Sequence, residues 1–484
     1  MKEKNKIYLT VFFSGFVLMV FEIVGIRILA PYLGSSSVVW TSIIGVILTF
    51  MSLGYWYGGV ISDKNPTLKK LSYILVFTAI SFLILNLSKE SILYVLARIS
   101  NNLILKSLVG SVILFSIPSF LLALISPIAI RINIKNVENS GETVGSIYAV
   151  STIGSILGTF LSGFFFIAFL GTNQILWALS IVLFILASIN AIDTVKKYFI
   201  LSISLFVGNL LSSFVPNDNI DFDTDYSRII ITESEYKNRD ARFMAINGYV
   251  NSGMYLDKPT ELIYEYAHFY DIIDYHFPNS KNAIMFGAGA YSYPKHFQEK
   301  FPKKQLDIVE IDPALTEIAK NHFQFTPNST TNIIHQDARY FLSITNKKYD
   351  AVLYDVLTSN LIAPFHLTTL ETFNYISNIM TDDGVFVMNI LGDLNGVGST
   401  FLKSEIKTVK EVFPQVYVFN ALGKDFEGIS NHMIVGLKTK SDAKIPDSGY
   451  FFDTYFRYLI SPVNIEQGII FTDNYAPANY LISK

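Results

Sequence analysis

The chain has 484 residues, of which 51% are apolar and only 16% are charged, and its mean hydropathy of +0.38 is too high for an ordinary soluble protein of this size. Part of it is therefore expected to lie in lipid. The 37 basic and 40 acidic residues leave a net charge of −3, so nucleic acid is not an expected partner. The absence of cysteine excludes thiolate nucleophiles, disulfides, cysteine-ligated zinc and iron–sulfur clusters.

Residues 1–215 form a string of apolar runs and are predicted to be an all-α transmembrane domain. A helix needs about 20 apolar residues to cross roughly 30 Å of hydrocarbon, and about seven runs meet this requirement. Between the third and fourth runs, apolar residues recur at helical spacing among polar ones, which predicts a helix lying in the membrane surface over 91–106, or a short additional span. The seven runs lie near residues 8–30, 38–60, 71–87, 107–131, 142–169, 173–192 and 198–215.

Basic residues beside these runs predict the orientation in the membrane. Lys2, Lys4 and Lys6 place the N-terminus in the cytoplasm, and basic residues after the second, fourth and sixth runs agree. Seven crossings would then put the C-terminal half outside the cell. The ligand inferred below is cytosolic, so a cytoplasmic C-terminal half is preferred. This orientation requires either that 198–215 does not cross the membrane fully or that 91–106 crosses it as well. We therefore expect a multi-pass protein of the cell membrane, in contact with lipid.

Two ionisable residues, Glu22 and Arg27, lie within the first apolar run, where an unpaired charge costs a few kcal/mol. They are about 140° apart on a helix and do not face each other well. Either they form a polar pocket inside the helix bundle, or Arg27 reaches towards the membrane surface while Glu22 bonds to a neighbouring helix. Close helix packing is indicated by glycines at four-residue intervals, namely Gly141 with Gly145 and Gly154 with Gly158.

Residues 216–484 read as a globular, charge-bearing sequence. A β-rich segment and a helix are predicted over 216–275, followed by an α/β region over 276–484. Short β-rich runs alternate there with helical stretches, which predicts a parallel sheet covered by helices and hence a Rossmann-like fold. The predicted strands are Ala283–Gly287, Leu306–Ile311, Asn332–Gln336, Asp350–Tyr354, Val385–Ile390, Val416–Asn420 and His432–Leu437.

Four motifs are predicted at the carboxyl ends of the first four strands, which meet at one edge of a parallel sheet. The first strand ends in a Gly-x-Gly turn at Gly287 and Gly289, where glycines let the backbone approach a ligand. Glu310 follows about 20 residues later, where an acid can bond to both ribose hydroxyls. Asp337 ends the third strand and can accept a hydrogen bond from an adenine amine, and Asp355 ends the fourth. These residues predict a nucleoside site.

Longer motifs accompany these residues. In the first half they are FEIVGIRILAPYLGSSSVVW and GETVGSIYAVSTIGSILGTFLSGF, and in the second GAGA, VEIDP, QDARYFL, YDAVLYD, PFHLTTLETF and TDNYAPANYL. With them the chain resembles, over nearly its whole length, the spermidine synthase-like members of the class I S-adenosylmethionine-binding fold, in the version fused to a membrane domain. The resemblance implies that Glu310 binds ribose, Asp337 binds adenine and Asp355 binds the amino end of a sulfonium ligand. It also implies that Tyr264, in an acid-x-x-Tyr active-site helix, faces the pocket.

Two positions depart from the family pattern. Thr358 stands where family enzymes carry a second Asp as the base and anchor for the acceptor amine. Ala290 replaces an Asp that grips the ammonium group of decarboxylated S-adenosylmethionine and would repel the carboxylate of intact S-adenosylmethionine. Both ligands therefore stay open. The carboxylate of intact S-adenosylmethionine can attack its own γ-carbon, releasing methylthioadenosine and homoserine lactone without a base.

Other side chains are candidates for the missing acid–base role. Tyr264 is favoured because a phenol can bond to the ligand amine or to the leaving group. His366 follows Asp355 closely enough to line the same crevice, although a lone histidine in such a loop is more often structural. His268 is a further candidate, and Asp473 is either an acid behind the site or a turn residue.

The predicted function is that of a membrane-bound spermidine synthase-like transferase, with S-adenosylmethionine or its decarboxylated form as substrate and methylthioadenosine as product. Aminopropyl transfer to a polyamine is the leading reaction. The alternatives are an S-adenosylmethionine lyase, a nucleoside-sensing transporter without turnover, and a methyltransferase. The predicted catalytic residues are Asp355, Tyr264 and His366. The sequence contains no P-loop, no H-E-x-x-H motif and no nucleophile elbow, so neither a metal nor a separate cofactor is expected.

Overall fold

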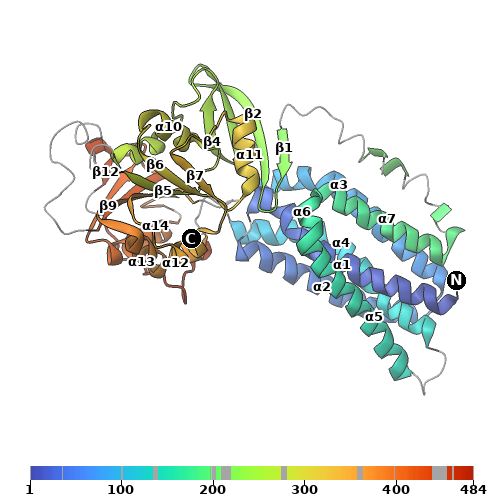
Figure 1. Cartoon of the computed structure of the whole chain (residues 1–484). Helices are drawn as coiled ribbons and strands as arrows, with labels where there is room; N and C mark the ends of the chain where they lie inside the picture. The colour runs from blue at the N-terminus through green and yellow to red at the C-terminus, as the bar shows by residue number, and fades with distance from the viewer. Residues whose placement is uncertain are drawn as a thin grey trace. The chain divides into compact units, whose positions relative to one another are not determined.

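The computed structural model in Figure 1 divides into two compact units, Met1–Asp218 and Asn219–Lys484. The first unit is helical and the second is built from strands and helices. The structure describes residues 2–34, 36–99, 102–134, 140–193, 195–196, 198, 203–205, 207–208, 220–273, 281–356, 364–396, 398–438, 455–460 and 463–482.

In the first unit, six helical stretches of the described residues are long and apolar enough to cross a membrane, and they coincide with the first six predicted spans. The seventh predicted span, near 198–215, lies almost entirely outside the described residues. The fifth stretch continues through a π-helical turn, η2. The elements are α1 (Glu3–Leu33), α2 (Ser37–Ser62), α3 (Leu68–Ile99), α4 (Leu103–Asn133), α5 (Ser140–Leu161), η2 (Ser162–Phe166), α6 (Ile167–Phe169) and α7 (Thr172–Asn190).

The prediction of a separate surface helix over 91–106 is wrong. Helix α3 runs without interruption to Ile99, and α4 begins at Leu103. Of the apolar residues that produce the helical spacing, Leu96 is 7% exposed and belongs to the main apolar cluster of the bundle, and Ile92 and Leu103 pack against that cluster. A face buried against neighbouring helices does not need the membrane surface to cover it.

Helix α1 packs closely along α5 at the positions of small residues. A β-carbon added to Gly154 would lie 2.0 Å from the Phe12 carbonyl oxygen, and one added to Gly158 would lie 2.5 Å from that of Phe16. Larger side chains are therefore excluded from this contact, as the four-residue spacing predicted. Gly141 and Gly145 have nothing within 4 Å of such an atom, so they take no part in the packing.

Arg27 bonds to backbone at the end of a helix. Its Nη1 donates to the carbonyl oxygens of Ile167 at 3.0 Å and Leu170 at 3.2 Å, at the C-terminal end of α6. Carbonyl groups at a helix end lack intrahelical donors and carry partial negative charge, so a guanidinium there is stabilising. The structure therefore assigns Arg27 a capping role, while Glu22 lies half-buried on the same helix.

The second unit begins with an antiparallel sheet of order β1-β2-β3-β4. Its strands pair consecutively through tight turns, which agrees with the predicted β-rich segment. The 3₁₀ helix η3 (Glu265–Asp271) follows it and replaces the expected active-site α-helix. The strands are β1 (Ile220–Asp223), β2 (Arg228–Tyr236), β3 (Arg239–Ile246) and β4 (Tyr249–Tyr255).

The main sheet of the second unit has eight strands in the order β12-β10-β11-β9-β8-β5-β6-β7. The seven predicted strands are all present, with ends shifted by a few residues. The strands are β5 (Asn282–Phe286), β6 (Gln305–Val309), β7 (Thr331–Ile334), β8 (Tyr349–Tyr354), β9 (Met380–Gly392), β10 (Gln415–Asn420), β11 (Ser430–Leu437) and β12 (Leu459–Ile460). The accompanying elements are α10 (Ser292–Lys300), α11 (Pro313–His322), α12 (Ala338–Ile344), η4 (Phe365–Leu367), α13 (Leu370–Ile379), α14 (Ser399–Val412), η5 (Phe456–Tyr458) and α16 (Ala478–Leu481).

The sheet is parallel only from β5 to β9. Strands β10, β11 and β12 pair antiparallel, which the prediction of a parallel sheet did not anticipate. The link between β10 and β11 is too short for the crossover that a parallel pair needs. The chain moves outward from β5 through β6 to β7 and then returns to place β8 on the other side of β5. Open α/β sheets bind ligands at such a switch point, beyond the carboxyl ends of the strands.

Both faces of the main sheet are covered, which explains the nearly continuous apolar runs of its central strands. In β5, Ile284 and Phe286 belong to one apolar cluster, while Ala283 and Met285 belong to another. Helices lie on both faces of the sheet in Figure 1. The strands are therefore rigidly held, and the residues that follow them are positioned by the core.

Candidate functional site

The two strands at the switch point, β5 and β8, bring the glycine turn and Asp355 together. Gly287 follows β5 with φ +77°, and a β-carbon there would lie 2.4 Å from the carbonyl oxygen of Asp355, which follows β8. Gly289 has φ +51°, and a β-carbon there would lie 2.4 Å from Oγ of Ser252, in strand β4 of the antiparallel sheet. Only glycine fits these two positions without strain.

Glu310 is joined to the glycine turn by a hydrogen bond. Its Oε2 accepts from the backbone N–H of Ala288 at 3.2 Å, and its Oε1 accepts from that of Asp312 at 3.0 Å. The side chain is 6% exposed, and burial raises the pKa of Glu310 to about 7, against the opposing effect of these backbone donors. The glycine turn, β6 and the start of α11 thus form one unit around this carboxyl.

Asp337 caps the N-terminus of α12, and only one of its oxygens is used for this. Oδ1 accepts from the backbone N–H of Tyr340 at 2.9 Å, while Oδ2 lies 3.7 Å from His366 Nε2. Burial raises the pKa of the Tyr226 phenol, and the charges of Asp312, Asp225, Asp337 and Glu310 add smaller effects in the same direction. Tyr226 precedes β2 and was not identified from the sequence.

Asp355 is partly buried among neutral hydrogen-bond donors. Its Oδ1 accepts from Asn389 Nδ2 at 2.9 Å, and its Oδ2 accepts from the Tyr266 hydroxyl at 3.3 Å. Asn389 Oδ1 in turn accepts from Asn431 Nδ2 at 2.9 Å. Burial raises the pKa of Asp355 although these donors oppose the change. Among the residues that the structure describes, no Lys, Arg or His forms an ion pair with this carboxylate.

Tyr266, two residues after the predicted Tyr264, bonds to Asp355. The two rings stack with centroids 6.1 Å apart and an angle of 17° between their planes. Tyr264 precedes η3 and is half-buried, and burial raises the pKa of its phenol to about 12. No hydrogen bond joins it to Asp355 in the described part of the chain. The tyrosine pair in the motif was a signal for Tyr266, whereas nothing local to Asn389 or Asn431 indicated a site.

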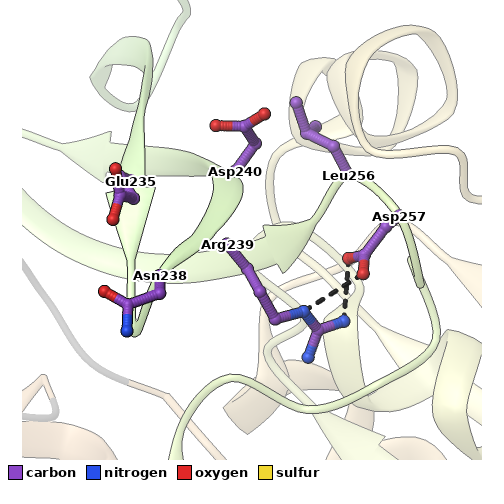
Figure 2. A pocket seen from close by; sticks show the side chains of 6 residues that line it. All are labelled: Glu235, Asn238, Arg239, Asp240, Leu256 and Asp257. Atoms are coloured by element: carbon purple, nitrogen blue, oxygen red, sulfur yellow. Dashed lines mark hydrogen bonds and ion pairs between the residues drawn. The ribbon is translucent and has the colours of Figure 1, made fainter.

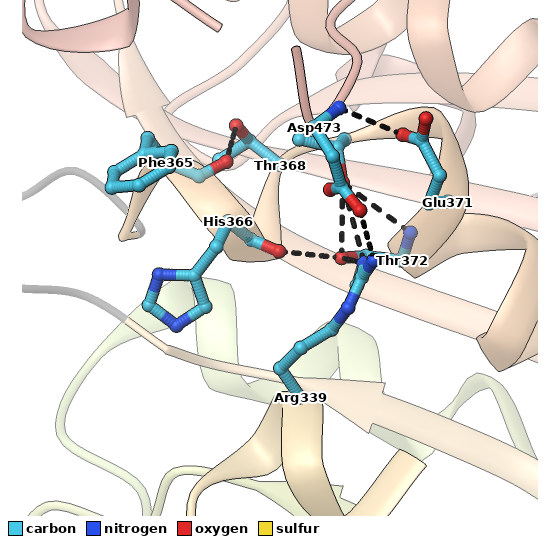
Figure 3. A network of polar contacts seen from close by, with 8 residues as sticks. Arg339, Phe365, His366, Thr368, Glu371, Thr372 and Asp473 are labelled. Carbon is cyan, nitrogen blue, oxygen red and sulfur yellow. Dashed lines mark hydrogen bonds and ion pairs between the residues drawn. The ribbon is translucent and has the colours of Figure 1, made fainter. Parts of the chain in front are cut away.

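The structure places His366 beside Asp337, and Asp473 lies in a network behind it that Figure 3 shows. Asp473 accepts from Arg339 Nη2 at 2.5 Å and from the Thr369 hydroxyl at 2.7 Å. Asp473 also lies in the turn between Thr472 and Tyr475, so its position agrees with both alternatives, a turn residue and an acid behind the site.

His268 belongs to another cluster. Its ring lies edge-on to His296 with centroids 6.2 Å apart, and its carbonyl oxygen accepts from the Tyr455 hydroxyl at 2.9 Å. Burial lowers the pKa of His268, and the opposing effect of Asp271 is smaller. His296 Nε2 lies 3.1 Å from Asp271 Oδ2. Within the described residues, the contacts of His268 are with this cluster and not with Glu310, Asp337 or Asp355.

Of the two positions that depart from the family pattern, the structure describes one. Ala290 is fully buried in an apolar cluster with Ile229 and Met244, and its backbone N–H donates to Ser252 Oγ at 3.1 Å. No acidic group occupies its place. Thr358 lies outside the described residues.

A second feature of this unit is the surface pocket in Figure 2, at the turn between β2 and β3. Arg239 is neutralised there by Asp257 at 2.7 Å and by Glu261 at 2.8 Å, and its guanidinium lies 3.8 Å from the centre of the Tyr255 ring. The cation is already satisfied by these contacts, and none of the predicted site residues lines the pocket. The lining residues are Glu235, Asn238, Arg239, Asp240, Leu256 and Asp257.

Comparison with known proteins agrees with this geometry. Residues 293–443 match the spermine/spermidine synthase domain family. The second unit contains a spermidine synthase domain. The matched part begins in α10, after the glycine turn, and includes β6 to β11 with Glu310, Asp337 and Asp355.

Two curated proteins and one solved structure are similar to parts of this chain. A polyamine aminopropyltransferase of Vibrio vulnificus (strain CMCP6) is 31% identical over 29% of this chain and 46% of its own length, so the match spans less than half of that relative. Polyamine aminopropyltransferase 2 of Aquifex aeolicus (strain VF5) is 24% identical over 85% of this chain and 84% of its own length, and that match includes apolar helices of the first unit. A probable spermidine synthase from Corynebacterium glutamicum ATCC 13032 covers 47% of this chain and 85% of its own, with a TM-score of 0.41 and 22% identity.

Proposed function

We propose that the spermidine synthase domain binds an adenosyl sulfonium compound, either S-adenosylmethionine or its decarboxylated form, and transfers the aminopropyl group of the decarboxylated form to a polyamine. The observation that carries this proposal is the environment of Asp355. Its carboxylate accepts from Asn389 and Tyr266, and in the described residues no cationic side chain neutralises it. A carboxylate taken partly out of water without a cation is costly unless a ligand supplies the positive charge.

A sulfonium ligand with an amino group supplies that charge. A cation close to a carboxylate favours its ionised form, so binding should lower the raised pKa of Asp355 and release a proton from the fraction that was protonated. A neutral nucleoside lacks the charge and gains nothing from this residue. Asp355 is therefore the group that distinguishes the reactive ligand from its nucleoside product.

The remaining predicted residues suit the adenosine part of the ligand. Glu310 is held by the Ala288 and Asp312 backbone N–H groups and retains acceptor capacity for ribose hydroxyls. Asp337 keeps Oδ2 for an adenine amine. The glycine turn at Gly287 and Gly289 leaves room for the ligand at the switch point.

In the proposed reaction, the nitrogen of a neutral polyamine amine attacks the aminopropyl carbon bonded to sulfur. The carbon–sulfur bond breaks, its electron pair stays on sulfur, and methylthioadenosine leaves. The new ammonium then gives up a proton to solvent. Positioning supplies much of the rate, because the nucleophile and the carbon must meet in line. Asp355 would hold the ligand, and Tyr266 and Tyr264 would form one wall beside it. The names of the Vibrio and Aquifex relatives favour this reaction.

One observation favours a second candidate, cleavage of intact S-adenosylmethionine to methylthioadenosine and homoserine lactone. Ala290 is buried in an apolar cluster, so no acid stands there to repel the carboxylate of that ligand. This reaction needs no acceptor and no external base.

Product analysis tests both candidates. The full chain, purified in detergent, is incubated with S-adenosylmethionine or its decarboxylated form, each with and without putrescine, and products are identified by mass spectrometry. Aminopropyl transfer predicts spermidine and methylthioadenosine only with putrescine. Lactone formation without an acceptor would establish the lyase instead. Release of S-adenosylhomocysteine, or binding without any turnover, would contradict both candidates and support the methyltransferase or the nucleoside sensor.

A further inference from the structure

We infer that His366 is a specificity-determining residue, which together with Asp337 reads the amino edge of the purine. This inference rests on the proposed adenosyl ligand and adds a residue to its recognition. His366 was considered from the sequence as an acid or base near Asp355. The structure instead pairs it with Asp337, while Asp355 bonds to Tyr266 and Asn389.

The two facing atoms lie close together without a hydrogen bond, and their side chains are partly exposed. His366 Nε2 and Asp337 Oδ2 are 3.7 Å apart, which is beyond hydrogen-bond distance. Each side chain is 39% exposed. No hydrogen bond to either atom occurs among the described residues, because the cap of α12 uses the other oxygen of Asp337, which accepts from the Tyr340 N–H. A nitrogen and an oxygen that can each take one more partner thus lie side by side.

A network of side chains holds His366 in this place. The Thr372 hydroxyl donates to the His366 carbonyl oxygen at 2.7 Å, and Arg339 Nη1 donates to the Thr372 hydroxyl in turn. Asp473 binds both Arg339 and Thr369. In Figure 3 the imidazole of His366 extends away from this network, which bonds to the backbone of His366 and not to its ring. Because Arg339 lies two residues after Asp337, the same network links the two recognition groups.

The pair matches the chemistry of adenine. The 6-amino group of adenine is a donor, and the ring nitrogens beside it are acceptors. Asp337 Oδ2 can accept from the amino group while His366 Nε2, when it carries a proton, donates to a ring nitrogen. Hypoxanthine has an oxygen at position 6, which would face the Asp337 carboxylate without a hydrogen between them. The pair should therefore select 6-amino over 6-oxo purines.

The test compares two neutral nucleosides, methylthioadenosine and methylthioinosine, which differ at position 6. Their dissociation constants are measured by calorimetry on the full chain in detergent. Because the 6-oxo group of methylthioinosine would face the Asp337 carboxylate without a hydrogen between them, wild type should prefer methylthioadenosine by roughly 10- to 100-fold. His366→Ala should weaken methylthioadenosine binding by about 5- to 20-fold and change methylthioinosine binding by less than about 2-fold. His366→Gln, which keeps a side-chain N–H donor, should preserve most of the selectivity.

Two controls separate recognition from folding. His322→Ala removes an imidazole that packs on Phe222 at 5.5 Å, so it should leave the ratio of the two constants unchanged. Equal loss of both nucleosides in His366→Ala would show a merely structural role and overturn the inference, as would unchanged methylthioadenosine binding. Those results would leave the proposed function intact provided that wild type binds adenosyl compounds. If wild type binds neither methylthioadenosine nor the sulfonium ligands, the proposed function fails as well.

Discussion

Replacing Asp355 by Asn should abolish the preference of the protein for a charged ligand. The substitution keeps the size and one acceptor oxygen, which can still receive the Asn389 amide, and it removes the negative charge. Two unit charges about 4 Å apart interact by ~4 kcal/mol at an effective dielectric constant of about 20, a value suited to a partly buried group. Because the amide dipole and entering water recover part of this energy, we expect a loss of ~2–4 kcal/mol for the sulfonium ligand, which is roughly 30- to 1000-fold in affinity.

The assay compares S-adenosylmethionine and its decarboxylated form with neutral methylthioadenosine on the same protein by calorimetry. Affinity for methylthioadenosine should change by less than about 5-fold, because it carries no charge to lose. Asp425→Asn, at an exposed carboxylate in the link between β10 and β11, is the matched control and should leave all three affinities unchanged. Turnover should fall below detection in Asp355→Asn only.

The stability of Asp355→Asn provides an internal check. Burial raises the pKa of Asp355 above its ordinary value of 3.8, so the folded protein keeps this proton at pH values where the unfolded chain has lost it. The free energy of unfolding therefore falls as pH rises through that window. The variant removes this cost and should melt no lower than wild type at neutral pH. Equal losses of charged and neutral ligands, or unchanged binding of the sulfonium compounds, would refute the role assigned to this carboxylate.

Three further predictions concern other parts of the chain. Glu405 is buried, neither of its oxygens has a hydrogen-bond partner among the described residues, and burial raises its pKa well above 4.5. While the folded protein keeps this proton, wild type loses ~1.4 kcal/mol of stability relative to Glu405→Gln for each pH unit above 4.5. Melting curves recorded at several pH values would show this difference. A wild-type melting temperature that falls in parallel with that of the variant would contradict this reading. Gly154→Leu should disrupt the α1–α5 contact and lower the melting temperature in detergent, whereas Gly145→Leu, with open space around it, should be tolerated. The chain has no cysteine, so Glu427→Cys at an exposed site of the second unit introduces a single thiol. If the second unit is cytoplasmic, an impermeant maleimide should label this thiol only after the cells are permeabilised. Labelling of intact cells would place the second unit outside the cell.

Much of the fold could be predicted from local sequence patterns. The apolar runs of the first unit and the alternating pattern of the second correspond to helices and strands because hydrophobic periodicity depends on neighbouring residues. The errors occurred where distant segments decide the outcome. The 91–106 region looked amphipathic, yet Leu96 is covered by the bundle and Ile92 packs against the same apolar cluster, and the first part of the region continues α3. The antiparallel pairing of β10, β11 and β12 likewise depends on which strands meet.

The sequence by itself determined that Gly287, Glu310, Asp337 and Asp355 end successive strands, because strand ends and turn residues are local properties. Their side-chain partners were decided only by the tertiary structure. Tyr266 reaches Asp355 across 89 positions of the chain and Asn389 reaches it across 34, and no spacing rule encodes such contacts. The same holds for His366, which follows Asp355 in sequence but lies beside Asp337 in space. A parallel sheet gathers strand ends at one edge, and packing of the connecting segments then selects which side chains meet there.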